Sequence, residues 1–132
     1  MSAKNLEEVI EKISQIDINE PFDMIVAIAN GGIIPAALIN QRLNLDIYLL
    51  KLNLRDKYQH QIFDQPQLIE PINFEFKEKR ILLVEDRVKT GATINYAQKL
   101  LSDAAIVKTF AVNGNADYSL YNESCFKFPW IL

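Results

Sequence analysis

The sequence has little of what marks secreted, membrane-spanning or nucleic-acid-binding proteins. Its 132 residues include one cysteine, Cys125, so no disulfide can form within the chain, which fits a reducing compartment. No apolar run approaches the roughly 18 residues of a membrane span, and residues 1–10 lack the apolar core of a signal peptide. Lys and Arg form no cluster, and the net charge is −3. We therefore expect a soluble cytoplasmic protein that binds neither membrane nor nucleic acid.

The hydrophobic content is sufficient for one folded domain. Hydrophobic residues make up 49% of the chain, and the length is that of a single domain, residues 1–132. Apolar residues recur at helical spacing after Asn5, and Glu8 completes a capping box with it. A first helix is therefore predicted to begin near Asn5 and to end at residues 19–21.

The remainder of the chain alternates between apolar runs and helical patterns. Residues 24–29 and 46–52 predict strands buried in a parallel sheet, with a Gly-Gly turn and a helix from Pro35 between them. Later segments predict an edge strand, a buried strand, a helix and another buried strand, at residues 72–76, 80–86, 94–101 and 105–112. The predicted fold class is α/β, a mostly parallel central sheet flanked by helices, with the chain end as an edge or tail after Pro129.

Residues 55–71 differ in character from the rest. They are polar, they lack a clear period, and they are long for a loop in a compact domain. Such loops often close over a site, and Arg55, Lys57 and His60 are candidate anion contacts within this one. A solvated loop without a binding role is the alternative for these three side chains.

One stretch, residues 81–94, carries the clearest chemistry. A buried strand ends in Glu85 and Asp86, and in open α/β sheets ligands bind beyond the carboxyl ends of strands. Carboxylates there can accept hydrogen bonds from sugar hydroxyls or hold a divalent cation through its water shell. The turn that follows, residues 89–93, meets a predicted helix N-terminus, where backbone N–H groups favour an anion.

The composition of this turn suits a phosphate. Gly91 allows close approach of the backbone, and the Thr90 and Thr93 hydroxyls can donate to phosphate oxygens. Acids for a ribose and donors for a phosphate together indicate a ribose phosphate as ligand. A helix cap beside a solvated corner would use the same residue types, and the glycine and lysine spacing is not that of a Walker loop.

This stretch, "ILLVEDRVKTGATI", resembles the phosphoribosyl-pyrophosphate motif of the type I phosphoribosyltransferases, in which four apolar residues precede two acids and a Thr-Gly-x-Thr turn. The Gly-Gly turn in "IVAIANGGIIPA" resembles the pyrophosphate loop of that family, and "FPWIL" is similar to the chain end of bacterial xanthine–guanine-type enzymes. The resemblance covers roughly residues 22–132.

The resemblance implies a pentosyltransferase that moves ribose 5-phosphate from phosphoribosyl pyrophosphate to a nucleobase, expected to be a purine, in nucleotide salvage. Mg²⁺ would accompany the pyrophosphate without a direct protein ligand, held through Glu85, Asp86 and waters. The residues nearest the reaction would be Glu85, Asp86 and Lys89. The implied ligand contacts are, for ribose phosphate, Glu85, Asp86, Lys89, Thr90, Gly91, Ala92 and Thr93; for pyrophosphate, Asn30 and Gly31; and for the base, Cys125 and Phe126. By the same resemblance, a homodimer or homotetramer is expected.

Four positions depart from the family pattern. Arg87 stands where an aliphatic residue is usual, and Lys89 stands where purine-specific enzymes carry an aspartate beside the reacting base nitrogen. A charged lysine cannot serve as that general base. Asn30 replaces a frequent Arg or Lys, and Cys125 falls where relatives place an aromatic ring that stacks on the purine. For the last position, the alternative is that Cys125 and Phe126 are core residues.

These departures leave three hypotheses open. The first is a nucleobase phosphoribosyltransferase acting on a purine. The second is a catalytically weak or inactive regulatory protein of the same fold that binds phosphoribosyl pyrophosphate or a nucleotide. The third is an enzyme with another acceptor, an anionic group of which meets Lys89. The sequence does not give the preferred base.

Overall fold

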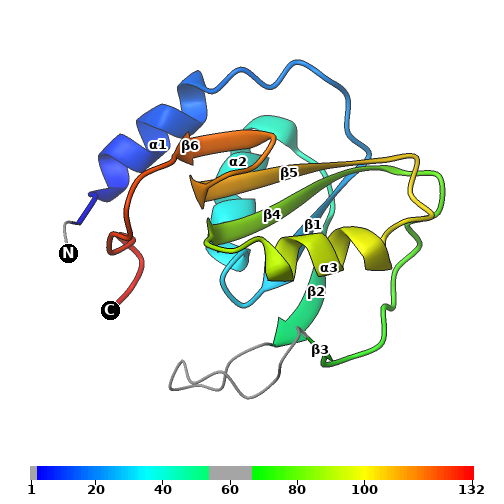
Figure 1. Ribbon diagram of the computed structural model, residues 1–132. Helices are drawn as coiled ribbons and strands as arrows, with labels where there is room; N and C mark the ends of the chain where they lie inside the picture. Colours follow the sequence, from blue (N-terminus) through cyan, green and yellow to red (C-terminus); the bar gives the residue numbers. More distant parts are fainter. Residues whose placement is uncertain (1–2, 54–66) are drawn as a thin grey trace.

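A single six-stranded sheet forms the centre of the molecule (Figure 1). The structure is a computed structural model, and it describes residues 3–53 and 67–132. The strand order is β3-β2-β1-β4-β5-β6, and every neighbouring pair is parallel except β2 and β3. The elements are α1 Leu6–Gln15, β1 Met24–Ala29, α2 Ile33–Leu43, β2 Ile47–Asn53, β3 Gln67–Leu68, β4 Arg80–Val88, α3 Ala92–Leu100, β5 Ile106–Gly114 and β6 Tyr118–Tyr121. The predicted fold class is confirmed.

Successive residues of a strand point to opposite sides of the sheet, and the central strands are apolar on both sides. Both faces must therefore be covered, and helices cover each of them. On one face, α1 and α2 pack against a cluster that includes Ile25, Leu82 and Phe110. On the other, α3 packs against a cluster that includes Val26 and Leu83 (Figure 1). Strand β1 is buried along its whole length, as its continuous apolar run predicted.

The first helix begins where the sequence predicts and ends earlier. Asn5 and Glu8 form the reciprocal capping box, with N···O distances of 2.8 and 2.9 Å. The predicted end at residues 19–21 is wrong, because α1 stops at Gln15 and Ile16 is extended. Arg42 of α2 donates to the carbonyl oxygens of Ile13 and Ile16, at 2.7 and 2.6 Å, and so satisfies acceptors that a helix end leaves open.

The edge strand predicted at residues 72–76 is wrong. The chain must pass from β3, at the sheet edge, to β4 in the centre, so this segment crosses the sheet rather than pairing with it. Its alternating apolar residues serve packing instead: Phe74 stacks on Tyr48 with ring centroids 5.1 Å apart, and Phe76 joins the same cluster. The short antiparallel strand lies earlier, at Gln67–Leu68.

The edge strand that the sequence analysis missed is β6, which pairs in parallel with β5. Residues 115–117 join the two strands, and Asp117 is hydrogen-bonded to Thr109 within β5. The backbone N–H of Thr109 donates to Asp117 Oδ2 at 2.8 Å, and its hydroxyl donates to the same oxygen at 3.0 Å. The tail after Pro129 is not a strand, in agreement with the sequence, although Lys127 makes an isolated parallel bridge with Ala3.

No helix among residues 3–53 and 67–132 is both long enough and apolar enough to cross a bilayer.

Candidate functional site

Two strand-to-helix turns meet at one edge of the sheet. Strands β1 and β4 are parallel neighbours, so their carboxyl ends lie side by side, each followed by the N-terminus of a helix. Residues 30–32 form the first turn and residues 89–91 the second. This edge is the place where open α/β sheets bind ligands.

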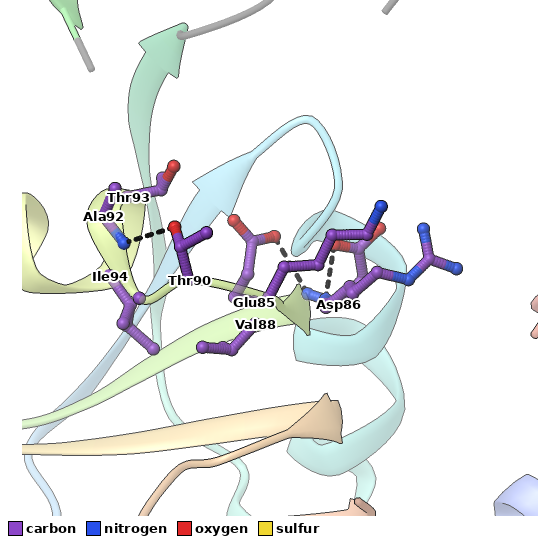
Figure 2. Close-up of a pocket in the computed structure, with 10 residues that line it drawn as sticks. Glu85, Asp86, Val88, Thr90, Ala92, Thr93 and Ile94 are labelled. Atoms are coloured by element: carbon purple, nitrogen blue, oxygen red, sulfur yellow. Dashed lines mark hydrogen bonds between the residues drawn. The ribbon is translucent and has the colours of Figure 1, made fainter. Parts of the chain in front are cut away.

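A pocket of about 280 Å³ opens at the second turn. Its lining residues are consecutive in the chain, Glu85, Asp86, Arg87, Val88, Lys89, Thr90, Gly91, Ala92, Thr93 and Ile94. In Figure 2, Glu85 and Asp86 project on one side of Thr90, and Thr93 lies on the other side at the start of α3. The structure therefore gathers every residue of the predicted ribose-phosphate loop around one cavity.

Glu85 is the buried member of the acid pair, with 9% of its surface exposed. Its Oε1 accepts a hydrogen bond of 2.9 Å from the backbone N–H of Asp86. Burial raises the pKa of the Glu85 carboxyl well above its usual value, and the neighbouring charge of Asp86 adds to the increase. The ionised form of Glu85 therefore has little water around it. Hydroxyl donors or a positive charge on a ligand would replace that missing solvation.

Asp86 reaches across to the first turn. A β-carbon placed on Gly31 would lie 2.8 Å from Cγ, Oδ1 and Oδ2 of Asp86, so the carboxylate rests directly on the glycine. The backbone N–H of Arg87 donates to Asp86 Oδ1 at 2.6 Å and fixes its orientation. The contact joins Gly31 of the predicted pyrophosphate loop to Asp86, a predicted ribose contact. The two residues meet because β1 and β4 are parallel neighbours and end side by side.

The second turn presents a helix N-terminus to the pocket. Gly91 has a φ of +88°, which favours glycine, and it precedes α3 without a side-chain cap. Thr90 Oγ1 accepts a hydrogen bond of 3.2 Å from the N–H of Ala92, which leaves the hydroxyl proton available to a ligand (Figure 2). The remaining N–H groups of the first turn of α3 and the helix dipole together favour an anion here.

Lys89 is exposed and lines the same pocket. It makes no ion pair with the described part of the chain, so its charge is available to a ligand. Asn30 is also exposed, at the end of β1, and its carbonyl oxygen accepts from the N–H of Ile33 as α2 begins. The Ala29–Asn30 peptide bond is cis.

The two predicted base contacts separate. Cys125 is exposed, whereas the Phe126 ring is completely buried between Tyr121 and Phe128, at centroid distances of 5.1 and 5.3 Å. Phe126 is therefore a core residue, as the alternative interpretation held, and its ring does not face the pocket because the core surrounds it. That interpretation is wrong for Cys125.

Arg87 connects this chain end to the pocket, a role that sequence reasoning missed. The guanidinium donates from Nη2 to the Phe126 carbonyl at 2.7 Å and lies 4.6 Å from the centroid of the Phe128 ring. The signal available beforehand was the departure itself, a cation in a position where relatives have an aliphatic side chain.

One set of predicted contacts lies outside the described residues. Arg55, Lys57 and His60 fall within residues 54–66, which the structure does not describe. Within the described ranges, no three His, Cys, Asp or Glu side chains group as a metal site.

Comparison with known proteins adds family and fold. Residues 2–120 match the model of the phosphoribosyl transferase domain. The xanthine-guanine phosphoribosyltransferase of Chromohalobacter salexigens is 36% identical over 94 residues, which are 71% of this chain and 56% of that protein. That of Idiomarina loihiensis is 25% identical over 118 residues, 84% of this chain and 72% of that protein. The match thus spans little more than half of the first relative.

Two solved structures share the fold. The purine phosphoribosyltransferase of Pyrococcus horikoshii superimposes with a TM-score of 0.78 at 20% identity, covering 97% of this chain and 92% of that one. A hypothetical protein from Neisseria gonorrhoeae with bound ppGpp gives a TM-score of 0.74 at 17% identity, covering 98% and 89%. At these identities the likeness concerns the fold alone.

Proposed function

The chain belongs to the phosphoribosyl transferase domain family, and from that premise we propose that it transfers ribose 5-phosphate from phosphoribosyl pyrophosphate to a purine base and releases pyrophosphate. The product would be a nucleoside monophosphate, which makes the reaction a step of purine salvage. The curated relatives named above are xanthine-guanine phosphoribosyltransferases, which supports a purine as acceptor.

The observation that carries the proposal is the continuous lining of the pocket. An acid pair at a strand tip and an uncapped helix N-terminus border the same cavity. Glu85 and Asp86 would accept hydrogen bonds from the ribose hydroxyls, and residues 89–93 would surround the 5-phosphate. Asn30 and Gly31 would present backbone groups to the pyrophosphate from the neighbouring turn.

The arrangement suits a reaction in which positive charge develops on the ribose. When the bond to pyrophosphate breaks, the sugar becomes oxocarbenium-like, and fixed negative charge nearby stabilises it. Asp86, held by the N–H of Arg87 and resting on Gly31, is preorganised for that task. Residues around the pocket would also exclude water from the reacting carbon.

The donor set is compatible with Mg²⁺ held through water. Magnesium keeps several waters and uses one or two carboxylates together with substrate phosphates. Glu85 and Asp86 each engage one carboxylate oxygen in a backbone hydrogen bond, which leaves a second oxygen on each for such waters. When bound, the ion would neutralise charge on the departing pyrophosphate.

Lys89 and Cys125 are the two residues near the expected base site that differ from the purine-specific enzymes, which carry an aspartate and an aromatic residue there. Lys89 in its charged form supplies a cation and no general base. It would contact an acceptor group of the base or the 5-phosphate. Exposed Cys125 would border the base without the stacking energy of an aromatic ring.

A second candidate follows from the same departures. The chain would then bind phosphoribosyl pyrophosphate or a nucleotide as a regulatory protein with little turnover. One protein of similar fold holds bound ppGpp, which supports nucleotide binding as a function of this architecture. An enzyme with a different, anionic acceptor is the third possibility.

One assay separates the candidates. The purified protein is incubated with phosphoribosyl pyrophosphate, Mg²⁺ and each of guanine, xanthine, hypoxanthine, adenine and uracil, and nucleotide is measured by chromatography. We expect product with at least one purine. No product with any base, together with measurable binding of phosphoribosyl pyrophosphate, would favour the regulatory protein instead.

The remaining expectations concern oligomeric state and localisation. A homodimer or homotetramer in the cytoplasm stays a prediction, to be checked by light scattering and by fractionation.

A further inference from the structure

Two side chains at paired positions of neighbouring strands hold the same loop. Arg87 of β4 and Asn113 of β5 are partners in the sheet register. Asn113 Nδ2 donates to the Glu123 carbonyl at 3.1 Å, and the Glu123 N–H donates to Asn113 Oδ1 at 3.0 Å. Arg87 Nη2 donates to the Phe126 carbonyl at 2.7 Å. The loop of residues 123–126 is therefore held at both of its ends.

Arg87 does more than support the loop. It lines the pocket, and its guanidinium lies over the Phe128 ring, which stacks on Trp130 with centroids 5.1 Å apart and planes 9° apart. Its Nε atom is buried and has no hydrogen-bond partner in the described residues. A buried donor without a partner costs free energy of folding, so stability alone does not account for an arginine at this position.

We propose that Arg87, which lines the pocket, and Asn113 are positioning residues that hold residues 123–126 beside the pocket, where this loop would meet the acceptor. The inference rests on the proposed function. Cys125 lies between the two points of attachment, Glu123 and Phe126, and is exposed, whereas the Phe126 ring is buried. The clamp formed by Arg87 and Asn113 would therefore determine which part of the loop faces a ligand. Acceptor affinity would depend on the clamp, and ribose-phosphate affinity would not.

Asn113→Ala is the sharper variant, because Asn113 is 3% exposed and does not line the pocket. Two probes share a ribose phosphate and differ by the base: guanosine 5′-monophosphate and ribose 5-phosphate. Calorimetry should show an affinity loss of about tenfold for the nucleotide, since two hydrogen bonds to the loop are removed. The affinity for ribose 5-phosphate should stay within about twofold. Arg87→Leu should weaken the nucleotide in the same way.

Thr109→Val is the matched control. It also removes hydrogen bonds between a buried β5 side chain and a later loop residue, in this case Asp117, and it keeps the side-chain volume. We expect it to lower thermal stability without separating the two affinities. A merely structural role for Asn113 would make Asn113→Ala behave like Thr109→Val.

A second readout does not depend on any ligand. Cys125 is the sole cysteine and is exposed, so a fluorescent maleimide labels this loop alone. Label anisotropy should fall in Asn113→Ala and Arg87→Leu and stay unchanged in Thr109→Val. Unchanged anisotropy in both clamp variants would overturn the proposal.

The failures are distinguishable. If the wild-type protein binds neither probe, the proposed function fails, and the acceptor role of the clamp fails with it. If the wild-type protein binds both probes and Asn113→Ala weakens both equally, or neither, the clamp alone is wrong.

Discussion

The carboxylate of Asp86 rests on the α-carbon of Gly31, so closely that a β-carbon at residue 31 would lie 2.8 Å from Cγ and both carboxylate oxygens. Gly31 belongs to the first strand-to-helix turn, whereas Asp86 lies in β4, the strand that leads into the second turn, so the contact joins the two turns into one site. Any side chain at residue 31 must displace the Asp86 carboxylate. The nearest atoms are the end of the Asp86 side chain, which can rotate away.

Gly31→Ala should therefore fold and lose ligand affinity. Displacing Asp86 breaks its hydrogen bond with the N–H of Arg87, and we expect ribose 5-phosphate to bind about tenfold more weakly. Calorimetry measures the affinity, and thermal melting should show a stability cost of about 1 kcal/mol.

Asp86→Ala supplies the control for this pair. On its own it should abolish ribose-phosphate binding and leave the fold intact. In that background, Gly31→Ala should cost little stability, because the clashing carboxylate is gone. Equal costs in both backgrounds would contradict the proposed contact.

Lys89→Asp tests the acceptor chemistry. The substitution restores a carboxylate that can take a proton from a base nitrogen, an effect worth about a hundredfold in general-base catalysis. We expect faster nucleotide formation with a purine, and a higher KM for phosphoribosyl pyrophosphate because a cation beside the anion is lost.

Lys99→Asp makes the same charge change in the last turn of α3, outside the pocket lining, and should alter neither parameter. Slower turnover of every base by Lys89→Asp would mean that the lysine itself serves the reaction.

Tyr118→Phe should flatten the alkaline part of the stability profile. Burial, together with a hydrogen bond to the Glu20 carboxylate, raises the pKa of Tyr118 to about 12. The unfolded phenol loses its proton near pH 10. The hydrogen-bonded phenol therefore contributes its full stabilisation below about pH 10, and this contribution is lost as the pH rises toward 12.

Urea unfolding of the wild-type protein and Tyr118→Phe on either side of about pH 10 measures the difference. Tyr96→Phe is the control, because its hydroxyl makes no hydrogen bond within residues 3–53 and 67–132. Parallel profiles for the wild-type protein and Tyr118→Phe would argue against the shifted pKa.

Leu82→Ala should show how much of the stability lies in the sheet centre. Leu82 is completely buried on β4, so truncation leaves a cavity that costs about 3 kcal/mol. Leu49→Ala removes the same atoms from a side chain that is 40% exposed, and its cost should be about 0.5 kcal/mol or less. Similar losses in the two variants, measured by urea unfolding, would contradict this account of the core.

Local patterns predicted the parts of the fold whose causes are local. The capping box of Asn5 and Glu8 and the buried run of β1 depend on residues close in sequence, and both appear as expected. The pocket lining is a single stretch, so its residues could be found together. Residues 72–76 and β6 depend instead on where the chain must cross the sheet and on which edge is left open, and neither fact is encoded in a short window.

The contacts of Arg87 and Asn113 could not be foreseen for the same reason. Arg87 reaches a carbonyl 39 residues away in the chain, and Asn113 reaches one 10 residues away. Both depend on strand order and on the path of the chain after β6. The sequence showed that arginine is unusual at position 87. The fold was needed to identify the Phe126 carbonyl as its hydrogen-bond partner.

The pocket is lined by ten consecutive residues, from the end of β4 into α3. A cavity built this way can be reshaped by single substitutions within one segment, since its lining comes from one continuous stretch of chain. On the proposed function, a substitution at Arg87 would alter the acceptor side and leave Glu85, Asp86 and Thr90 in place, whereas a substitution at Lys89 would alter the phosphate contacts as well.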